Sequence, residues 1–140
     1  MATFARRATF RQAVDGAGIE KMLSIELAAS GTVVRVTHTI VNRLYRPIEV
    51  APWAITAVVP ASVAVRPQPP FRPHPEAIFT AGDYLEVETL GPLALLPPGG
   101  ETTHEERWAL APDVSLPPDD EPLAETLTEL ARQLLGSRPS

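Results

Sequence analysis

The stretch Ile19–Val41, IEKMLSIELAASGTVVRVTHTIV, decides the fold of this chain. Apolar and polar side chains alternate along Ile19–Ala29 and again along Thr32–Val41, which is typical of half-buried strands. Ser30-Gly31 between the two runs is a turn signal. The sequence therefore predicts an antiparallel hairpin, with His38 on the apolar face of its second strand.

Further strands are expected on both sides of this hairpin. An apolar stretch at Ile48–Val59 contains Pro52, which favours a bulge or a break over one continuous central strand. The ten residues Arg66–Pro75 contain five prolines and are expected to be extended or turn-like. The other candidate strands are a weak one within Ala2–Val14, a short one at Ser62–Val65, and alternating ones at Tyr84–Leu90 and Thr102–Ala111.

Composition agrees with one small β-rich domain. The chain has 140 residues, enough for one core, and its 16 prolines exclude an all-helical bundle, because proline clashes inside helices. The lack of cysteine excludes disulfides, thiolate catalysis and cysteine-ligated zinc. The net charge of −5 argues against nucleic-acid binding, and no apolar run is long enough to cross a bilayer. We therefore expect a cytoplasmic protein with no nucleic-acid or membrane partner.

The C-terminal tail changes to helical periodicity. Four leucines recur at the spacing of one helix face: Leu123, Leu127, Leu130 and Leu134. Pro122 suits a first helical turn. We expect an antiparallel β-sandwich domain at 1–112, a proline-rich linker at 113–121, and a helix at 122–136 packed on the same domain. The predicted fold class is all-β, an antiparallel β-sandwich with one C-terminal amphipathic α-helix.

Glu86 and Glu88 are the first candidates for chemistry. They lie two residues apart in an expected strand, so both side chains point to the same side of the sheet. Paired carboxylates can raise one pKa and supply a general base or acid. A solvated strand face produces the same pattern and is the commoner reason for it.

The histidines supply candidate acids and ligands. His104 is expected to share a strand face with Glu106 and Trp108, which suits a sugar-binding surface and equally an ordinary sheet surface. His38, among valines, is either a hydrogen-bonded core histidine or an acid catalyst. His74 lies between two prolines and is a candidate ligand. The spacing of the three histidines matches no zinc or iron motif, so the sequence predicts no metal site and no cofactor.

Four segments together resemble a bacterial family that has no assigned activity. Its fold is the galactose mutarotase-like β-supersandwich, distantly similar to aldose 1-epimerases. The segments are VTHTIVNR (36–43), RPIEVAPWAIT (46–56), PQPPFRPHP (67–75) and FTAGDYLEVETLGPLALLPPGGETTHEERWAL (79–110). The stretches ETLGPL and HEERW are the most specific of these.

The resemblance implies a carbohydrate-binding protein and leaves open an epimerase-like activity. In aldose 1-epimerases a glutamate takes the proton of the anomeric hydroxyl while a histidine protonates the ring oxygen. Glu88 best matches the position of that base, and His38 or His104 would serve as the acid. The implied sugar-binding residues are Glu86, Glu106, Trp108, Trp53 and His74.

The chain also looks like a shortened version of this family, because Glu76–Ile78 replaces a longer expected segment after Pro75. A shortened sandwich leaves strand edges bare, which need cover either by the C-terminal helix or by a second copy of the chain in a homodimer. The alternative function is therefore a non-catalytic β-sandwich domain that self-associates.

Overall fold

The computed structural model describes residues 6–58, 76–80, 84–115, 117–118 and 120–135. Its strands form antiparallel sheets followed by one helix, so the predicted all-β fold with a C-terminal helix is confirmed. A four-stranded sheet has the order β1 (Arg7–Gln12), β2 (Ile19–Leu27), β3 (Val34–Asn42), β9 (Glu101–Trp108). A three-stranded sheet has the order β5 (Trp53–Val58), β7 (Leu85–Leu90), β6 (Glu76–Thr80). The short strands β4 (Ile48–Val50) and β8 (Ala94–Leu96) pair with each other.

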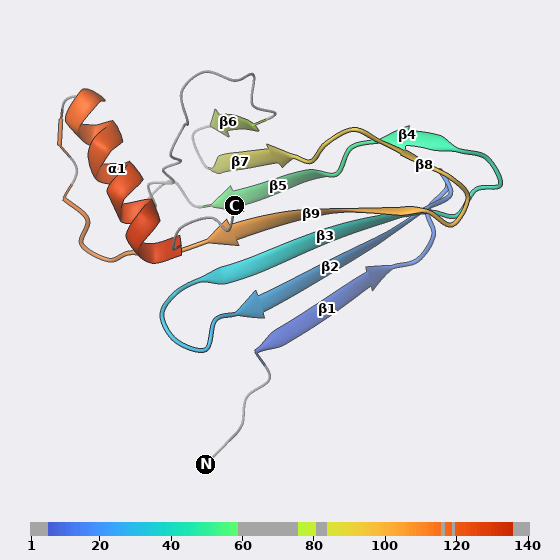
Figure 1. The fold of residues 1–140 in the computed structure, drawn as a ribbon, viewed down its shortest axis with the longest axis horizontal. Helices are drawn as coiled ribbons and strands as arrows, with labels where there is room; N and C mark the ends of the chain where they lie inside the picture. The colour runs from blue at the N-terminus through green and yellow to red at the C-terminus, as the bar shows by residue number, and fades with distance from the viewer. Residues whose placement is uncertain (1–5, 59–75, 81–83, 116, 119, 136–140) are drawn as a thin grey trace, which may run out of the picture.

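The predicted hairpin is the centre of the larger sheet. β2 and β3 pair in a register that sets Leu23 opposite His38 and Lys21 opposite Ile40. β1 adds to the outer side of β2, and all six of its residues are exposed. β9 closes the other side of β3, with His38 directly opposite His104. Figure 1 shows β1 at the lower edge of the molecule and the three-stranded sheet above β9.

Pro52 breaks the apolar stretch as predicted. β4 ends before it and β5 begins after it, and the Pro52 side chain is fully buried. The main-chain carbonyl of Pro52 accepts a 2.7 Å hydrogen bond from Gly91 N–H, just beyond β7. A Cβ at Gly91 would lie only 3.1 Å from Pro52 Cδ and 3.2 Å from His104 Cβ. Glycine at this position therefore lets the second sheet approach β9 closely.

Few side chains of the described chain are buried, and nearly half of them are polar. The buried apolar ones are Val41, Pro52, Ala54, Val87 and Leu96, and the buried polar ones are Glu20, Asn42, Thr89 and Glu106. Thr89 and Glu106 lie where the sheets meet, whereas Glu20 lies on the other face of the larger sheet. Every buried side-chain nitrogen or oxygen in this part of the chain has a hydrogen-bond partner. Hydrogen bonds between side chains therefore contribute to the contact between the sheets alongside apolar packing.

Asn42 ties together the end of the molecule that carries β4 and β8. Its side-chain amide donates to the carbonyls of Arg46, Leu96 and Pro97 at 2.9–3.1 Å, and its Oδ1 accepts from Leu44 N–H. These groups lie in loops or at strand ends, where the ladders leave carbonyls without a partner. One buried side chain thus replaces several missing ladder bonds.

Some strand boundaries differ from the predictions. The first strand covers only Arg7–Gln12, and the last ends at Trp108 rather than Ala111. There the Thr32 hydroxyl donates to Leu110 O at 2.6 Å and accepts from Leu110 N–H, so side-chain bonds replace the ladder. β6 and β8 were not predicted, because each is short and lies beside proline.

The helix α1 spans Asp120–Leu135 and is amphipathic as predicted. The four leucines that recur at helical spacing are half-buried, whereas Glu125, Glu129 and Arg132 are exposed. Figure 1 shows α1 at the left of the sheets. Its packing on the sandwich and the boundaries at 112 and 121 stay predictions. The expected strand at Ser62–Val65 and the extended segment Arg66–Pro75 lie outside the described residues.

Candidate functional site

A polar cluster lies where the two sheets meet. It consists of His38 on β3, His104 and Glu106 on β9, and Thr89 on β7. His38 Nε2 lies 2.9 Å from Glu106 Oε2, and the Thr89 hydroxyl lies 2.8 Å from Glu106 Oε1. His104 Nε2 lies 2.6 Å from the same Thr89 hydroxyl, and the two imidazole rings are 6.2 Å apart. We call these four residues the inter-sheet cluster.

The positions of the protons follow from Glu106. A carboxylate can only accept, so the Thr89 hydroxyl gives its hydrogen to Glu106 and accepts one from His104 Nε2–H. His38 likewise donates from Nε2 to Glu106. Burial raises the pKa of Glu106, but the hydrogen bonds from His38 and Thr89, with the charges of both histidines, outweigh it and hold that pKa below its usual value. Glu106 is therefore an ionised group that positions the imidazole rings.

Glu88 does not reach either histidine. Its side chain leaves β7 on the opposite face from Thr89, and its carboxylate accepts a 3.1 Å hydrogen bond from Trp53 Nε1–H in an exposed position. Glu88 and His104 therefore do not form the base and acid pair that the resemblance implies, because consecutive strand residues point to opposite faces and it is Thr89 that faces His104. Of the predicted catalytic residues, the structure brings together His38 and His104 but not the proposed base.

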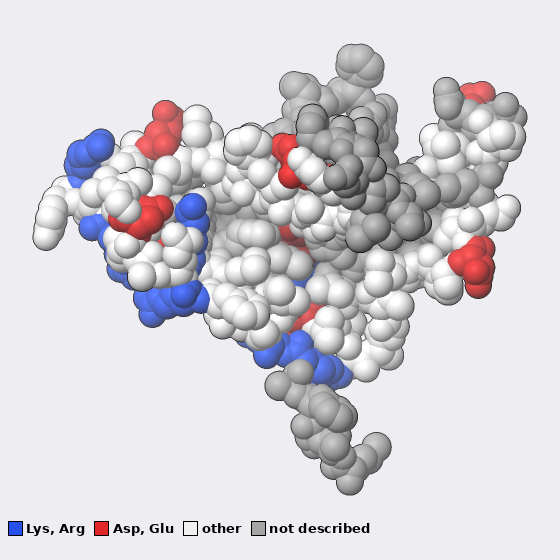
Figure 2. Space-filling model, turned by 180° about the vertical axis from the view of Figure 1, so that it is seen from behind, with Lys and Arg blue, Asp and Glu red and all other residues white. Residues whose placement is uncertain are grey.

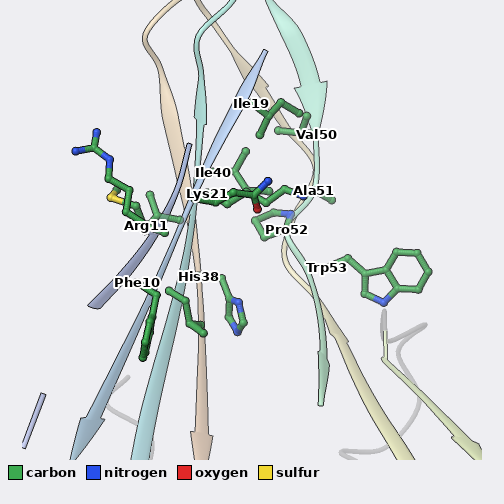
Figure 3. Close-up of a pocket in the computed structure, with 14 residues that line it drawn as sticks. Phe10, Arg11, Ile19, Lys21, His38, Ile40, Val50, Ala51, Pro52 and Trp53 are labelled. Carbon is green, nitrogen blue, oxygen red and sulfur yellow. The ribbon is translucent and has the colours of Figure 1, made fainter. Parts of the chain in front are cut away.

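The predicted sugar-binding residues are divided between two faces. Glu86 is half-buried on the same face of β7 as Glu88. Trp108 shares the face of β9 that carries His104 and Glu106, opposite Val34 of β3. Trp53 is 63% exposed and points away from the strands of the larger sheet (Figure 3). His74 lies outside the described residues.

A groove of about 730 Å³ opens beside His38. Its floor is the inner face of β1, β2 and β3, and its wall is the segment Val50–Trp53 between β4 and β5. It forms because the three-stranded sheet covers β9 and leaves β1 and β2 uncovered, so that Phe10 is 58% exposed. The side chains that matter below are Phe10, Gln12, Lys21, Leu23, His38 and Pro52, all of which line it.

The described lining of the groove contains basic residues and no acidic one. In Figure 3 Lys21 lies in the middle of the group, beside Ile40 and facing the Ala51–Pro52 turn. Arg11 points away, and its guanidinium hydrogen-bonds the buried Glu20 on the other face of the sheet. Seen from behind, basic side chains gather at the left and lower margins of a largely uncharged middle (Figure 2).

The sequence did not predict Thr89 as part of the inter-sheet cluster, or Lys21 and Ala51-Pro52 as part of the groove. Thr89 follows Glu88 in the strand, so alternation places it on the opposite face, but nothing in its neighbourhood marks it as the link between two distant strands. Lys21 alternates with Ile19, Leu23 and Ile25, and a lone lysine on an apolar strand face is a usable signal for a groove. Ala51-Pro52 gave no such signal, because only the packing of β4 and β5 brings it over β2.

No group of three potential metal ligands occurs among the described residues. Within the same ranges, no helix combines the length and apolar character needed to span a membrane. Comparisons with family models, curated proteins and solved structures found no match to this chain. The galactose mutarotase-like fold family therefore stays a prediction from the sequence.

Proposed function

We propose that this chain is a carbohydrate-binding domain that holds its ligand in the groove without transforming it. The observation that carries the proposal is the groove itself, of about 730 Å³, with an accessible aromatic ring and a fixed imidazole in its lining. Phe10 offers a ring for the apolar face of a sugar, and Gln12 and His38 offer hydrogen-bonding groups for its hydroxyls. The resemblance to the mutarotase-like family supports the same ligand class.

The arrangement of the carboxylates supports binding rather than epimerisation. Ring opening needs a base and an acid that both reach one sugar ring. Glu88 faces away from His38 and His104, and it lies beside Trp53 instead. Glu106 is close to both histidines, but its two oxygens are already engaged by His38 and Thr89.

The test is binding and catalysis measured on the same samples. We expect amide chemical-shift changes in β1, β2 and β3 on titration with a panel of monosaccharides, and no faster anomer interconversion by polarimetry than in buffer. Phe10→Ala should weaken binding severalfold, whereas Tyr45→Ala, which removes a fully exposed aromatic ring outside the groove, should not. Sugar-independent spectra would refute the proposal, and acceleration that Glu88→Gln abolishes would restore the epimerase hypothesis.

A second candidate function is self-association, which one specific observation favours. The inner face of β1 and β2 has no covering layer in the described structure, and Phe10 and Leu27 are 58% and 49% exposed on it. A second copy could supply that layer. Light scattering after size-exclusion chromatography would then give a mass twice that of the 15.1 kDa chain. The Phe10→Glu variant should have the mass of a single chain.

A further inference from the structure

We propose that the groove selects small molecules bearing a carboxylate, and that Lys21 is the residue that binds the anion. The inference rests on the proposed binding function and adds the charge of the ligand to it. It follows from the charge of the lining, the absence of a partner for Lys21 within the described structure, and the surroundings of its ammonium group.

The charge of the groove is opposite to that of the chain. The protein carries 17 acidic and 12 basic residues, yet none of the described residues that line the groove is acidic. Arg11 does not supply the positive charge, because its guanidinium is bound to Glu20 on the other face of the sheet. The ammonium of Lys21 is therefore the permanent cation that faces a ligand in this groove.

Lys21 has no internal partner in the described part of the chain. Glu20 is its neighbour in sequence but points to the opposite face of β2, where Arg11 and Arg43 bind it. Glu106 is held by His38 and Thr89. An unpaired ammonium gains a charge-assisted hydrogen bond when a carboxylate binds, and no existing ion pair has to be broken first.

The neighbours of Lys21 suit a carboxylate attached to a partly apolar body. Gln12 lies directly opposite Lys21 across the β1–β2 ladder, so its amide is placed to donate to the second carboxylate oxygen. Phe10 lies opposite Leu23 in the same ladder, and these two side chains form an apolar surface next to the charged group.

Two matched pairs of compounds separate the contribution of the carboxylate from that of the rest of the ligand. The sugar pair is glucuronate and glucose, and the aromatic pair is 3-phenylpropionate and 3-phenylpropanamide. The two members of each pair have nearly the same sugar ring or phenyl group, and only one member carries the carboxylate. Affinities are measured by calorimetry on the full chain at low salt, and again at high salt, where screening should weaken only the acids.

Lys21 is the only lysine in the sequence, which provides a direct reporter. Reductive methylation with ¹³C-formaldehyde gives one dimethylated ε-amine that keeps its positive charge and is distinct in the NMR spectrum from the α-amine. We expect its ¹³C signal to move on titration with an acid that binds and to stay in place with the neutral partner.

We expect the acid to bind about tenfold more tightly than its neutral partner in at least one pair, which is about 1.4 kcal/mol. Lys21→Met should remove that difference and leave the neutral member unchanged. Arg35→Met is the matched control, since it removes one exposed cation from the opposite face of the sheet, and it should keep the difference. Equal binding of acids and neutral partners, or an acid preference that survives in Lys21→Met, would overturn this inference and leave the binding function standing. If none of the four compounds binds but a sugar of the monosaccharide panel does, this inference fails and the proposed function stands; if no sugar binds either, both fail.

Discussion

At the scale of single residues, Glu106 on β9 links the larger sheet to the three-stranded sheet through Thr89. It is 7% exposed, and it receives hydrogen bonds from β3 through His38 and from β7 through Thr89. We expect Glu106→Gln to lower the free energy of unfolding by about 2 kcal/mol, because a neutral amide cannot accept both bonds with the strength of a carboxylate. Urea unfolding at pH 7 measures this, with Glu105→Gln, an exposed neighbour, as the control. A loss no larger than the control's would contradict the role given to Glu106.

The same residue predicts a pH dependence. Because the folded pKa of Glu106 is held below its unfolded value, its stabilisation is complete above the unfolded pKa, near 4.3, and is lost as the pH falls through the folded pKa. The groups that face it are His38, Thr89 and, through Thr89, His104. Below about pH 4.3 the stability difference between wild type and Glu106→Gln should therefore shrink. A difference that grows with acidification would contradict the direction of the shift.

Asn42 is the second residue whose loss the structure makes costly. Asn42→Ala should lower the free energy of unfolding by about 3 kcal/mol, because the carbonyls of Arg46, Leu96 and Pro97 would lose their donor inside the protein. Asn42→Asp keeps an acceptor for Leu44 N–H but also loses the donors, so it should be no better than alanine. Thermal unfolding followed by circular dichroism tests both. An aspartate variant as stable as wild type would show that the donors contribute little.

At the scale of elements, β1 is a strand that burial does little to hold in place. All its residues are exposed, and its side-chain links to β2 are Arg7 and Thr9 to Ser24 and Arg11 to Glu20. The hydrogen bonds from Arg11 and Arg43 hold the pKa of Glu20 below its usual value, so Glu20 is ionised and binds both arginines at neutral pH. We expect Arg11→Met to speed amide exchange of β1 severalfold while β3 and β9 stay unchanged. Arg35→Met is the control, and faster exchange throughout the sheet would contradict a local role.

The elements also show which predictions local sequence supports. Alternation is a local property, so it predicted the β2–β3 hairpin, the face of His38 and the extended stretch at Leu85–Leu90. Proline acts on its own backbone, so the break at Pro52 was predictable too. β6 and β8 were missed, because strands of five and three residues carry too few alternations and depend on their partners.

At the scale of the whole molecule, the small interior leaves little apolar burial to stabilise a monomer. The few buried apolar residues of the described chain, together with the uncovered face of β1 and β2, predict a low free energy of unfolding, about 5 kcal/mol or less for the monomer. If a second copy covers that face, the midpoint of thermal unfolding should rise with protein concentration. Calorimetry over a tenfold concentration range measures this. A midpoint independent of concentration would leave the groove to a small ligand.

The sequence by itself determined the class of fold, the central hairpin, the break at Pro52 and the amphipathic tail, because periodicity and proline geometry act over a few neighbouring residues. Only the tertiary structure decided which chemistry-bearing side chains meet. It separated Glu88 from the histidines, joined Glu106 and Thr89 to them, and placed Lys21 in a groove below Pro52. These contacts join residues from 15 to 68 positions apart, and they depend on how the sheets stack, which no local pattern encodes.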